Sequence, residues 1–235
     1  MPPNGLSFSD QVSATFTSQL DTIATSHTFK TNHVLFNDGD RADFLYLIHS
    51  GSIKLFKTTE DGKELTLQVC NAGELVGVVG IFEKNLSYNS TGIILDTAEL
   101  AIIPRANLEN LLLQNSDFCV EFMRWMGMVH RRTQSKFRDL LLNGKTGALY
   151  STLIRMSNTY GVKQQDGILI DLSLTNRDLA QYIGLTRESV NRMLADLRKN
   201  DVIDILPLGH ILIKDLSYLK LAIHCDDCPP DICQI

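Results

Sequence analysis

The sequence predicts an α+β protein in which a rolled, β-rich first half is followed by a long helix and a smaller helical domain with a β-hairpin. Short runs of β-branched and aromatic residues alternate with turn signals from about residue 29 to 103. After Pro104 the apolar residues recur at helical spacing instead. With 235 residues, 44% of them hydrophobic and 21% charged, the chain is long enough for two hydrophobic cores.

Turn signals divide the first half into short antiparallel strands. They fall at residues 37–40, 50–51, 60–63 and 71–73. The runs between them, FLYLIHSG, SIKLFKTT and ELTLQVC, alternate partly between apolar and polar residues, as half-buried strands do. We therefore expect a β-roll within residues 1–115. Cys70 and Cys119 are interpreted as small, buried core residues.

A long helix is expected next, because no proline interrupts residues 117–143. Its 27 residues would span roughly 40 Å, a length suited to a two-helix dimer seam. We assign residues 116–144 to dimerisation, and packing of the helix on its own domain is the alternative. The expected apolar stripe consists of Phe118, Phe122, Trp125, Val129, Phe137 and Leu140.

Residues 145–221 predict a winged helix-turn-helix. In the segment LTNRDLAQYIGLTRESVNRML, Thr175 and Thr186 can cap two successive helices, and Gly184 can take the positive φ of the turn between them. Two β-rich runs joined by a turn at Pro207 follow, and they predict the hairpin of the wing.

The charge of this segment favours contact with nucleic acid. Residues 175–199 carry five basic and three acidic side chains, a local charge of +2 in a chain of −5. Arg187 and Glu188 occupy the first turn of the second helix, and Arg192 follows about one turn later. Arginine can bind guanine through two acceptors and glutamate can accept from cytosine, so these residues suit a G/C-containing site. A solvated helix face is the alternative.

The tail, residues 222–235, holds three of the five cysteines within nine positions. Evenly spread, five cysteines would place only about 0.2 in such a window. The spacing Cys225-x2-Cys228-x4-Cys233 therefore indicates a metal or redox site.

These features together resemble the Crp/Fnr superfamily of bacterial transcription regulators over about residues 25–220. The resemblance implies a cyclic-nucleotide-binding-like β-roll, and a homodimer that binds double-stranded operator DNA and contacts RNA polymerase. The Arg-Glu-x-Val-x-Arg pattern resembles the recognition helix of the cAMP receptor protein, which implies TGTGA-like half-sites in a palindrome. The expected DNA-binding residues are Thr175, Thr186, Arg187, Glu188, Ser189, Asn191 and Arg192.

The residues of the roll argue against cAMP as the effector. In members that bind cAMP, a glutamate for the ribose and an Arg-Ser pair for the phosphate follow Gly-Glu-Leu. Here Val78 stands at the position of the glutamate, and Tyr88-Asn89 at the Arg-Ser pair. Burial of a phosphate without a charged partner is costly, so cAMP is not expected to bind.

The cysteine tail resembles that of the Fnr proteins of Bacillus. This resemblance implies one 4Fe-4S cluster per subunit, bound by Cys225, Cys228, Cys233 and, as a non-cysteine ligand, Asp139 at the end of the dimer helix. Thiolates suit iron-sulfur clusters by their softness. From the residues alone, Asp139 is interpreted as a surface carboxylate or as a helix salt-bridge partner of Lys136. Zinc bound with the help of His224, or a thiol-disulfide switch, are the alternatives for the cysteines.

These resemblances imply an anaerobic, oxygen-responsive transcription regulator that binds DNA while the cluster is intact. A Crp-like regulator controlled by a small ligand, zinc or thiol redox state is the alternative. No catalytic constellation accompanies the β-roll, so an enzyme is not expected. The first twenty residues lack a signal-peptide pattern and no run of about 18 apolar residues occurs, so a cytoplasmic protein without a membrane segment is expected.

Overall fold

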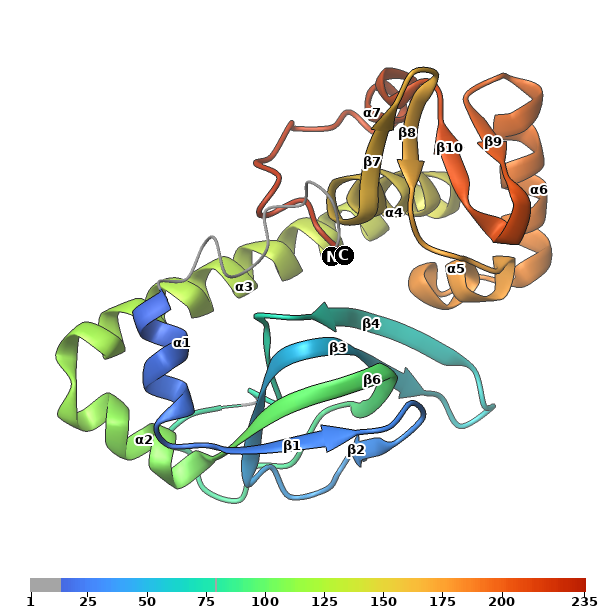
Figure 1. The fold of residues 1–235 in the computed structure, drawn as a ribbon. Helices are drawn as coiled ribbons and strands as arrows, with labels where there is room; N and C mark the ends of the chain where they lie inside the picture. The colour runs from blue at the N-terminus through green and yellow to red at the C-terminus, as the bar shows by residue number, and fades with distance from the viewer. Residues whose placement is uncertain (1–13, 79) are drawn as a thin grey trace. The chain divides into compact units, whose positions relative to one another are not determined.

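The computed structural model describes residues 14–78 and 80–235, which form two compact units (Figure 1). The boundary falls between Gly127 and Met128, within helix α3 (Ser116–Leu142). Residues 1–13 lie outside the described residues. The expected roll domain began within them, and the expectation that the first twenty residues hold no signal peptide also concerns them. Both units combine helices with an antiparallel sheet, so the predicted α+β class is confirmed.

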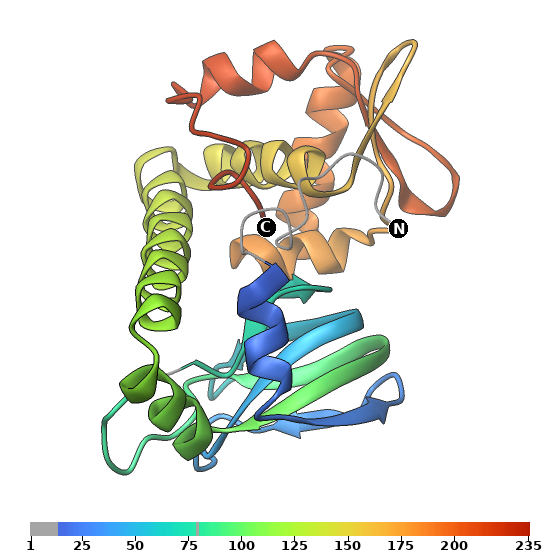
Figure 2. The same ribbon diagram turned by 60° about the vertical axis from the view of Figure 1, so that its left-hand side comes forward.

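The first unit is a rolled sheet flanked by helices α1 (Ala14–Asp21) and α2 (Arg105–Gln114). Its sheet has the order β1-β6-β3-β4, with β2 added beside β6 and β5 beside β3. The two longest strands, β3 and β6, curve side by side across the roll (Figures 1 and 2). The strands span Thr25–Phe29 (β1), Val34–Phe36 (β2), Phe44–Thr58 (β3), Glu64–Asn71 (β4), Leu75–Val76 (β5) and Thr91–Pro104 (β6).

The turn expected at residues 50–51 is wrong, because β3 continues through it. The register of β3 against β6 shifts on both sides of Ser50, which marks a bulge. Gly51 adopts a φ of +83°, and a Cβ there would lie 2.6 Å from the carbonyl oxygen of Thr97. Glycine is needed at this close approach of two strands, and the same residue type that marks a turn marks a bulge here.

The stripe expected to form the dimer seam is wrong for the first half of α3. Phe118 and Phe122 are buried, and Phe118 stacks on Phe16 of α1 with ring centroids 4.9 Å apart. The exposed apolar side chains of this half include Met123, which is 67% exposed. The alternative, packing on its own domain, therefore holds for the first half of the stripe. Dimerisation through α3 stays a prediction for the exposed face and for the second half, where Phe137 is exposed.

The second unit contains the predicted helix-turn-helix and wing. Helix α4 (Gly144–Tyr160) packs against α5 and α7, and the sheet order is β7-β8-β10-β9. Strand β7, which pairs with β8, follows α4 directly and was not expected from the sequence. The remaining elements are β7 (Gly161–Gln164), β8 (Gly167–Ile170), α5 (Asn176–Ile183), α6 (Arg187–Lys199), β9 (Ile203–Ile205), β10 (Ile211–Ile213) and α7 (Leu216–Ala222).

Among the helices of the described residues, none combines the length and the apolar character that a membrane span requires.

Candidate functional site: a recognition helix and a docked cysteine tail

Helix α6 is fixed in the unit by its caps and its buried face. Thr186 accepts a hydrogen bond from the Ser189 backbone N–H, and Thr175 forms a capping box with Asp178 at the start of α5. Gly184 adopts a φ of +64° between the two helices. Val190, Leu194 and Leu197 bury the inner face of α6. The expected caps and turn are confirmed.

The outer face of α6 presents the side chains that were expected to contact DNA. Arg187, Glu188 and Arg192 are exposed. Within residues 14–78 and 80–235 none of these three side chains forms an ion pair or a hydrogen bond, so all three are available to a ligand. Asn191 is also exposed, but its side-chain oxygen accepts a hydrogen bond from Asn176 of α5. Base contact by any of these residues stays a prediction.

The C-terminal tail lies along α3 and α4 of the same unit (Figure 2). Helical side chains bind its backbone directly. Arg132 donates to the carbonyl of Asp231 at 2.6 Å, and Asn158 donates to the carbonyl of Cys233 at 2.8 Å. The side chains of Ile232, Cys233 and Ile235 are buried, which adds an apolar contribution to the docking.

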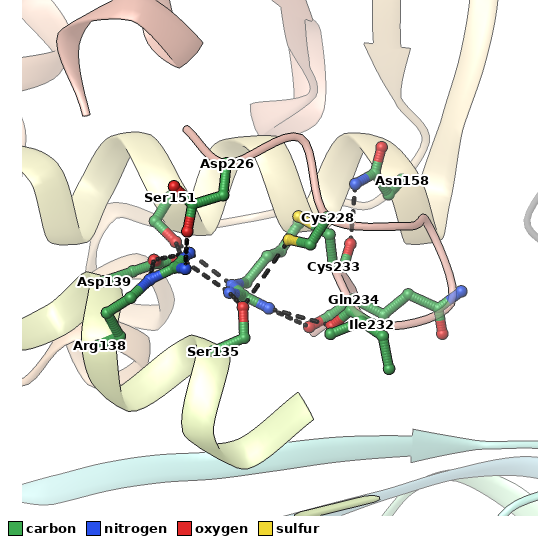
Figure 3. Close-up of polar contacts among 11 residues, drawn as sticks. Ser135, Arg138, Asp139, Ser151, Asn158, Asp226, Cys228, Ile232, Cys233 and Gln234 are labelled. Carbon is green, nitrogen blue, oxygen red and sulfur yellow. Dashed lines mark hydrogen bonds and ion pairs between the residues drawn. The ribbon is translucent and has the colours of Figure 1, made fainter. Parts of the chain in front are cut away.

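Asp139 lies at the centre of a polar network beneath this tail (Figure 3). One carboxylate oxygen, Oδ2, accepts from Arg155 at 2.6 Å and from Ser151 at 2.7 Å. The other, Oδ1, accepts from Arg138, which also pairs with Asp226 of the tail. Burial alone would raise the pKa of Asp139, but these hydrogen bonds outweigh it and lower the pKa below its ordinary value. Asp139 is therefore an ionised, buried carboxylate, not a surface one.

Two of the tail thiols are neighbours in this network. The Cys228 sulfur lies 3.8 Å from the Ser135 hydroxyl, and the side chains of Cys228 and Cys233 lie beside each other (Figure 3). Burial, followed by the proximity of Cys228, raises the pKa of Cys233 to about 12, although Arg155 opposes the rise. Cys225 is partly exposed. In the described part of the chain, no three cysteine, histidine or acidic side chains already lie close enough to hold one metal ion.

Sequence reasoning missed Arg155, which connects Asp139 to the tail. Its side chain is 1% exposed, and it contacts α3, α4 and the backbone of the tail. A signal was present, because Arg155 is the only charged residue between Lys145 and Lys163. A lone charge within a long uncharged stretch of a helix indicates burial with a partner.

The interior of the roll is filled by aromatic side chains at the position compared above with the phosphate-binding pair. Tyr88 is 4% exposed and stacks on Phe36 with centroids 3.9 Å apart. Its hydroxyl donates to the carbonyl of Phe44 at 2.7 Å. Asn89 is exposed. The Tyr88 hydroxyl is therefore hydrogen-bonded within the roll itself.

Two family models match the two units. The model of the cyclic nucleotide-binding domain matches residues 26–115, and that of the Crp-like helix-turn-helix domain matches residues 147–222. Among curated proteins, the anaerobic regulatory protein of Bacillus subtilis (strain 168) is 46% identical over 227 residues, which cover 97% of this chain and 95% of that protein. The global nitrogen regulator of Nostoc sp. (strain PCC 7120 / SAG 25.82 / UTEX 2576) is 30% identical over 76% of this chain and 80% of that protein.

Solved structures agree on the fold. A mutant of CooA from Carboxydothermus hydrogenoformans has a TM-score of 0.73 at 18% identity, over 87% of this chain and 90% of that one. The c-di-GMP responsive global regulator CLP from Xanthomonas campestris has a TM-score of 0.72 at 22% identity, over 86% and 99%. The two family models and the curated relatives point to a transcription regulator. The chain therefore belongs to the Crp/Fnr family of transcription regulators.

Proposed function

We propose that this chain is an oxygen-responsive regulator that binds palindromic DNA as a homodimer while a 4Fe-4S cluster is bound at its C-terminal tail. The observation that carries the proposal is the docking of the cysteine tail beside a buried, ionised Asp139. The 46% identical relative from Bacillus subtilis, which is named an anaerobic regulatory protein, supports it.

The donor set fits an iron-sulfur cluster by its chemistry. Cys225, Cys228 and Cys233 would supply three soft thiolates and Asp139 one oxygen. Cys233 must lose its proton to bind metal, and its raised pKa makes binding release a proton near neutral pH. For the same reason Cys233 is a weak nucleophile without metal, which disfavours a disulfide switch that begins at this residue.

Basic side chains lie around the tail, and each of the three named next is paired with a carboxylate. Arg138 pairs with Asp226, Arg155 with Asp139, and Lys220 with Asp227 at 2.7 Å. When bound, the cluster would supply a link between the tail and α3 that oxygen can break. Zinc remains the alternative occupant, with His224 as a fourth ligand in place of Asp139.

The path from this site to DNA runs through α4. Asp139 and Ser135 lie on α3, and both accept hydrogen bonds from Arg155 of α4. Helix α4 packs against α5, the first helix of the helix-turn-helix. A change at Asp139 would therefore alter how α6 is held, and a dimer needs its two recognition helices about 34 to 36 Å apart. Arg187, Glu188 and Arg192 would then contact TGTGA-like half-sites.

The roll serves as a scaffold in this proposal. The stacking of Tyr88 on Phe36 and its hydrogen bond to Phe44 support a roll whose interior is occupied by its own side chains. Calorimetry with cAMP and cGMP tests this part, and micromolar binding of either nucleotide would contradict it.

The central experiment is anaerobic purification followed by analysis of iron, sulfide and zinc. We expect about four iron and four sulfide per subunit, as the 4Fe-4S composition requires. Binding to a TGTGA-like palindrome is then measured before and after exposure to air, and affinity should fall after exposure. A colourless protein with one zinc per subunit, or DNA affinity unchanged by air, would contradict the proposal.

A further inference from the structure

Arg155 donates hydrogen bonds to three parts of the second unit: α3, α4 and the C-terminal tail. It donates to Asp139 at 2.6 Å and to Ser135 at 2.9 Å, both on α3, and to Ser151 of α4 at 3.2 Å. It also donates to the tail, at 3.3 Å to the carbonyl of Ile232 and at 3.4 Å to that of Gln234. A guanidinium has five N–H donors in a fixed plane, and here they are directed at five different oxygens.

Burial makes this arrangement difficult to exchange for another. Arg155 is 1% exposed, so its charge must be matched by Asp139 and its remaining N–H groups by other acceptors. Two of those acceptors are backbone carbonyls of the tail. If the tail left, two donors of a buried cation would lose their partners, which is costly.

We propose that Arg155 is a positioning residue that docks the end of the tail and orients Asp139 without any metal. The proposal rests on the proposed function only where it treats Asp139 and Cys233 as ligands. Arg155 and Ser151 both hold Oδ2 of Asp139, and both are buried. Oδ1 is held by Arg138, whose side chain is 38% exposed and can turn into solvent at lower cost. Oδ1 is therefore the oxygen that Asp139 offers to a metal, while Oδ2 stays fixed.

The tail then consists of two parts with different behaviour. In residues 231–235 the backbone carbonyls accept hydrogen bonds from the side chains of Arg132, Arg155 and Asn158, and some of the side chains are buried. Residues 225–228 are tied mainly by partly exposed ion pairs of Asp226 and Asp227, which are weak. Loss of metal would free the part that carries Cys225 and Cys228 and leave Cys233 docked.

Hydrogen exchange of the iron-free protein tests the docking directly. The backbone N–H groups of Ile232 and Cys233 donate to the carbonyl of Pro229 at 2.9 and 3.0 Å, and that of Ile235 donates to Thr159 at 3.2 Å. The substitution Arg155→Lys keeps the positive charge but loses the planar guanidinium and its fixed N–H donors. We expect these three amides to exchange about tenfold faster, because about one charge-assisted hydrogen bond is lost. Exchange within the first unit, which does not contain Arg155, should not change.

Arg131→Lys is the matched control, because Arg131 is an exposed arginine on α3. It should leave tail exchange at the wild-type rate. If circular dichroism reports that Arg155→Lys does not fold, Asn158→Ala is used instead, and it should speed exchange at Cys233 and Ile235. Tail exchange unchanged in a folded Arg155 variant, or in Asn158→Ala when that variant replaces it, would overturn the proposal.

Iron retention provides the second readout and separates the two proposals. After anaerobic reconstitution, Arg155→Lys should lose iron to a chelator about tenfold faster than wild type. If wild type bound no iron but Arg155→Lys still released the tail, the docking role would stand and the proposed oxygen sensing would fail. If iron were retained equally by both proteins, Arg155 would not orient Asp139, and that part of the proposal would be overturned.

Discussion

Substitution of Asp139 by asparagine should destabilise the second unit of the iron-free protein strongly. Asp139 and Arg155 form a pair whose side chains are 9% and 1% exposed. Removal of one partner of a buried pair costs about 3 to 5 kcal/mol, because the remaining charge is left without compensation. Arg155 keeps neutral acceptors from Ser135, Ser151 and the tail, so we expect the lower end, about 3 kcal/mol.

Asp226→Asn is a matched control within the same network. Asp226 pairs with Arg138, but the two side chains are 64% and 38% exposed. An exposed pair contributes at most about 1 kcal/mol, because solvent screens it. Both variants remove one carboxylate charge and keep the shape of the side chain, so their difference isolates burial.

Thermal and urea unfolding, followed by circular dichroism without iron, measures the effect. For a chain of this size about 3 kcal/mol corresponds to a fall in Tm of roughly 6 to 12 °C. The double variant Asp139→Asn/Arg155→Met should recover part of the loss, since it removes the uncompensated cation as well. If Asp139→Asn were no less stable than Asp226→Asn, the buried pair would not be the centre of this network and the reasoning would be refuted.

Three further predictions concern DNA, metal and assembly. Arg192→Ala should weaken operator binding by about 1 to 3 kcal/mol and relax specificity at one base pair per half-site, as measured by fluorescence anisotropy. If wild type and Arg192→Ala each bound matched and mismatched operators with equal affinity, base readout by Arg192 would be contradicted. Cys233→Ser should abolish iron binding while Cys70→Ser, in the core of the roll, should keep the wild-type iron content, measured after anaerobic reconstitution. Met123→Glu should shift sedimentation toward the monomer, because it would place a charge on the exposed face of α3, whereas the control Leu113→Glu on α2 should leave sedimentation unchanged. If both variants remained dimers, the interface would lie elsewhere.

The helix-turn-helix could be predicted from sequence because its determinants are local. Thr175 and Thr186 cap helices that begin at the next residue, and Gly184 supplies the positive φ between them. Each of these features depends on neighbours only a few residues away. The bulge at Gly51 could not be separated from a turn, because the deciding contact is with Thr97 on a distant part of the chain.

Helix α3 illustrates a second limit of periodicity. Phe118 and Phe122 have the spacing of an interface stripe, but they pack on Phe16 in α1 of the same unit. Periodicity reveals that a face is apolar and not what covers it. Likewise, Asp139 could be named as a candidate ligand, yet its partner Arg155 is 16 positions away and becomes visible only when α3 and α4 meet.

The docked tail changes how a signal at the cysteines would reach the DNA-binding helices. A tail released as a whole would have to uncouple Arg155 from two carbonyls and expose Ile232 and Ile235, which are buried. A smaller change is sufficient. If Asp139 Oδ1 held a metal, loss of that metal would let Oδ1 pair with Arg138 and rearrange the charge around Arg138 and Asp226, while Arg155 would still join α3 to α4. Because α4 packs on α5, even a small shift where α3 meets α4 would change the position of α6. No large movement of the tail is required.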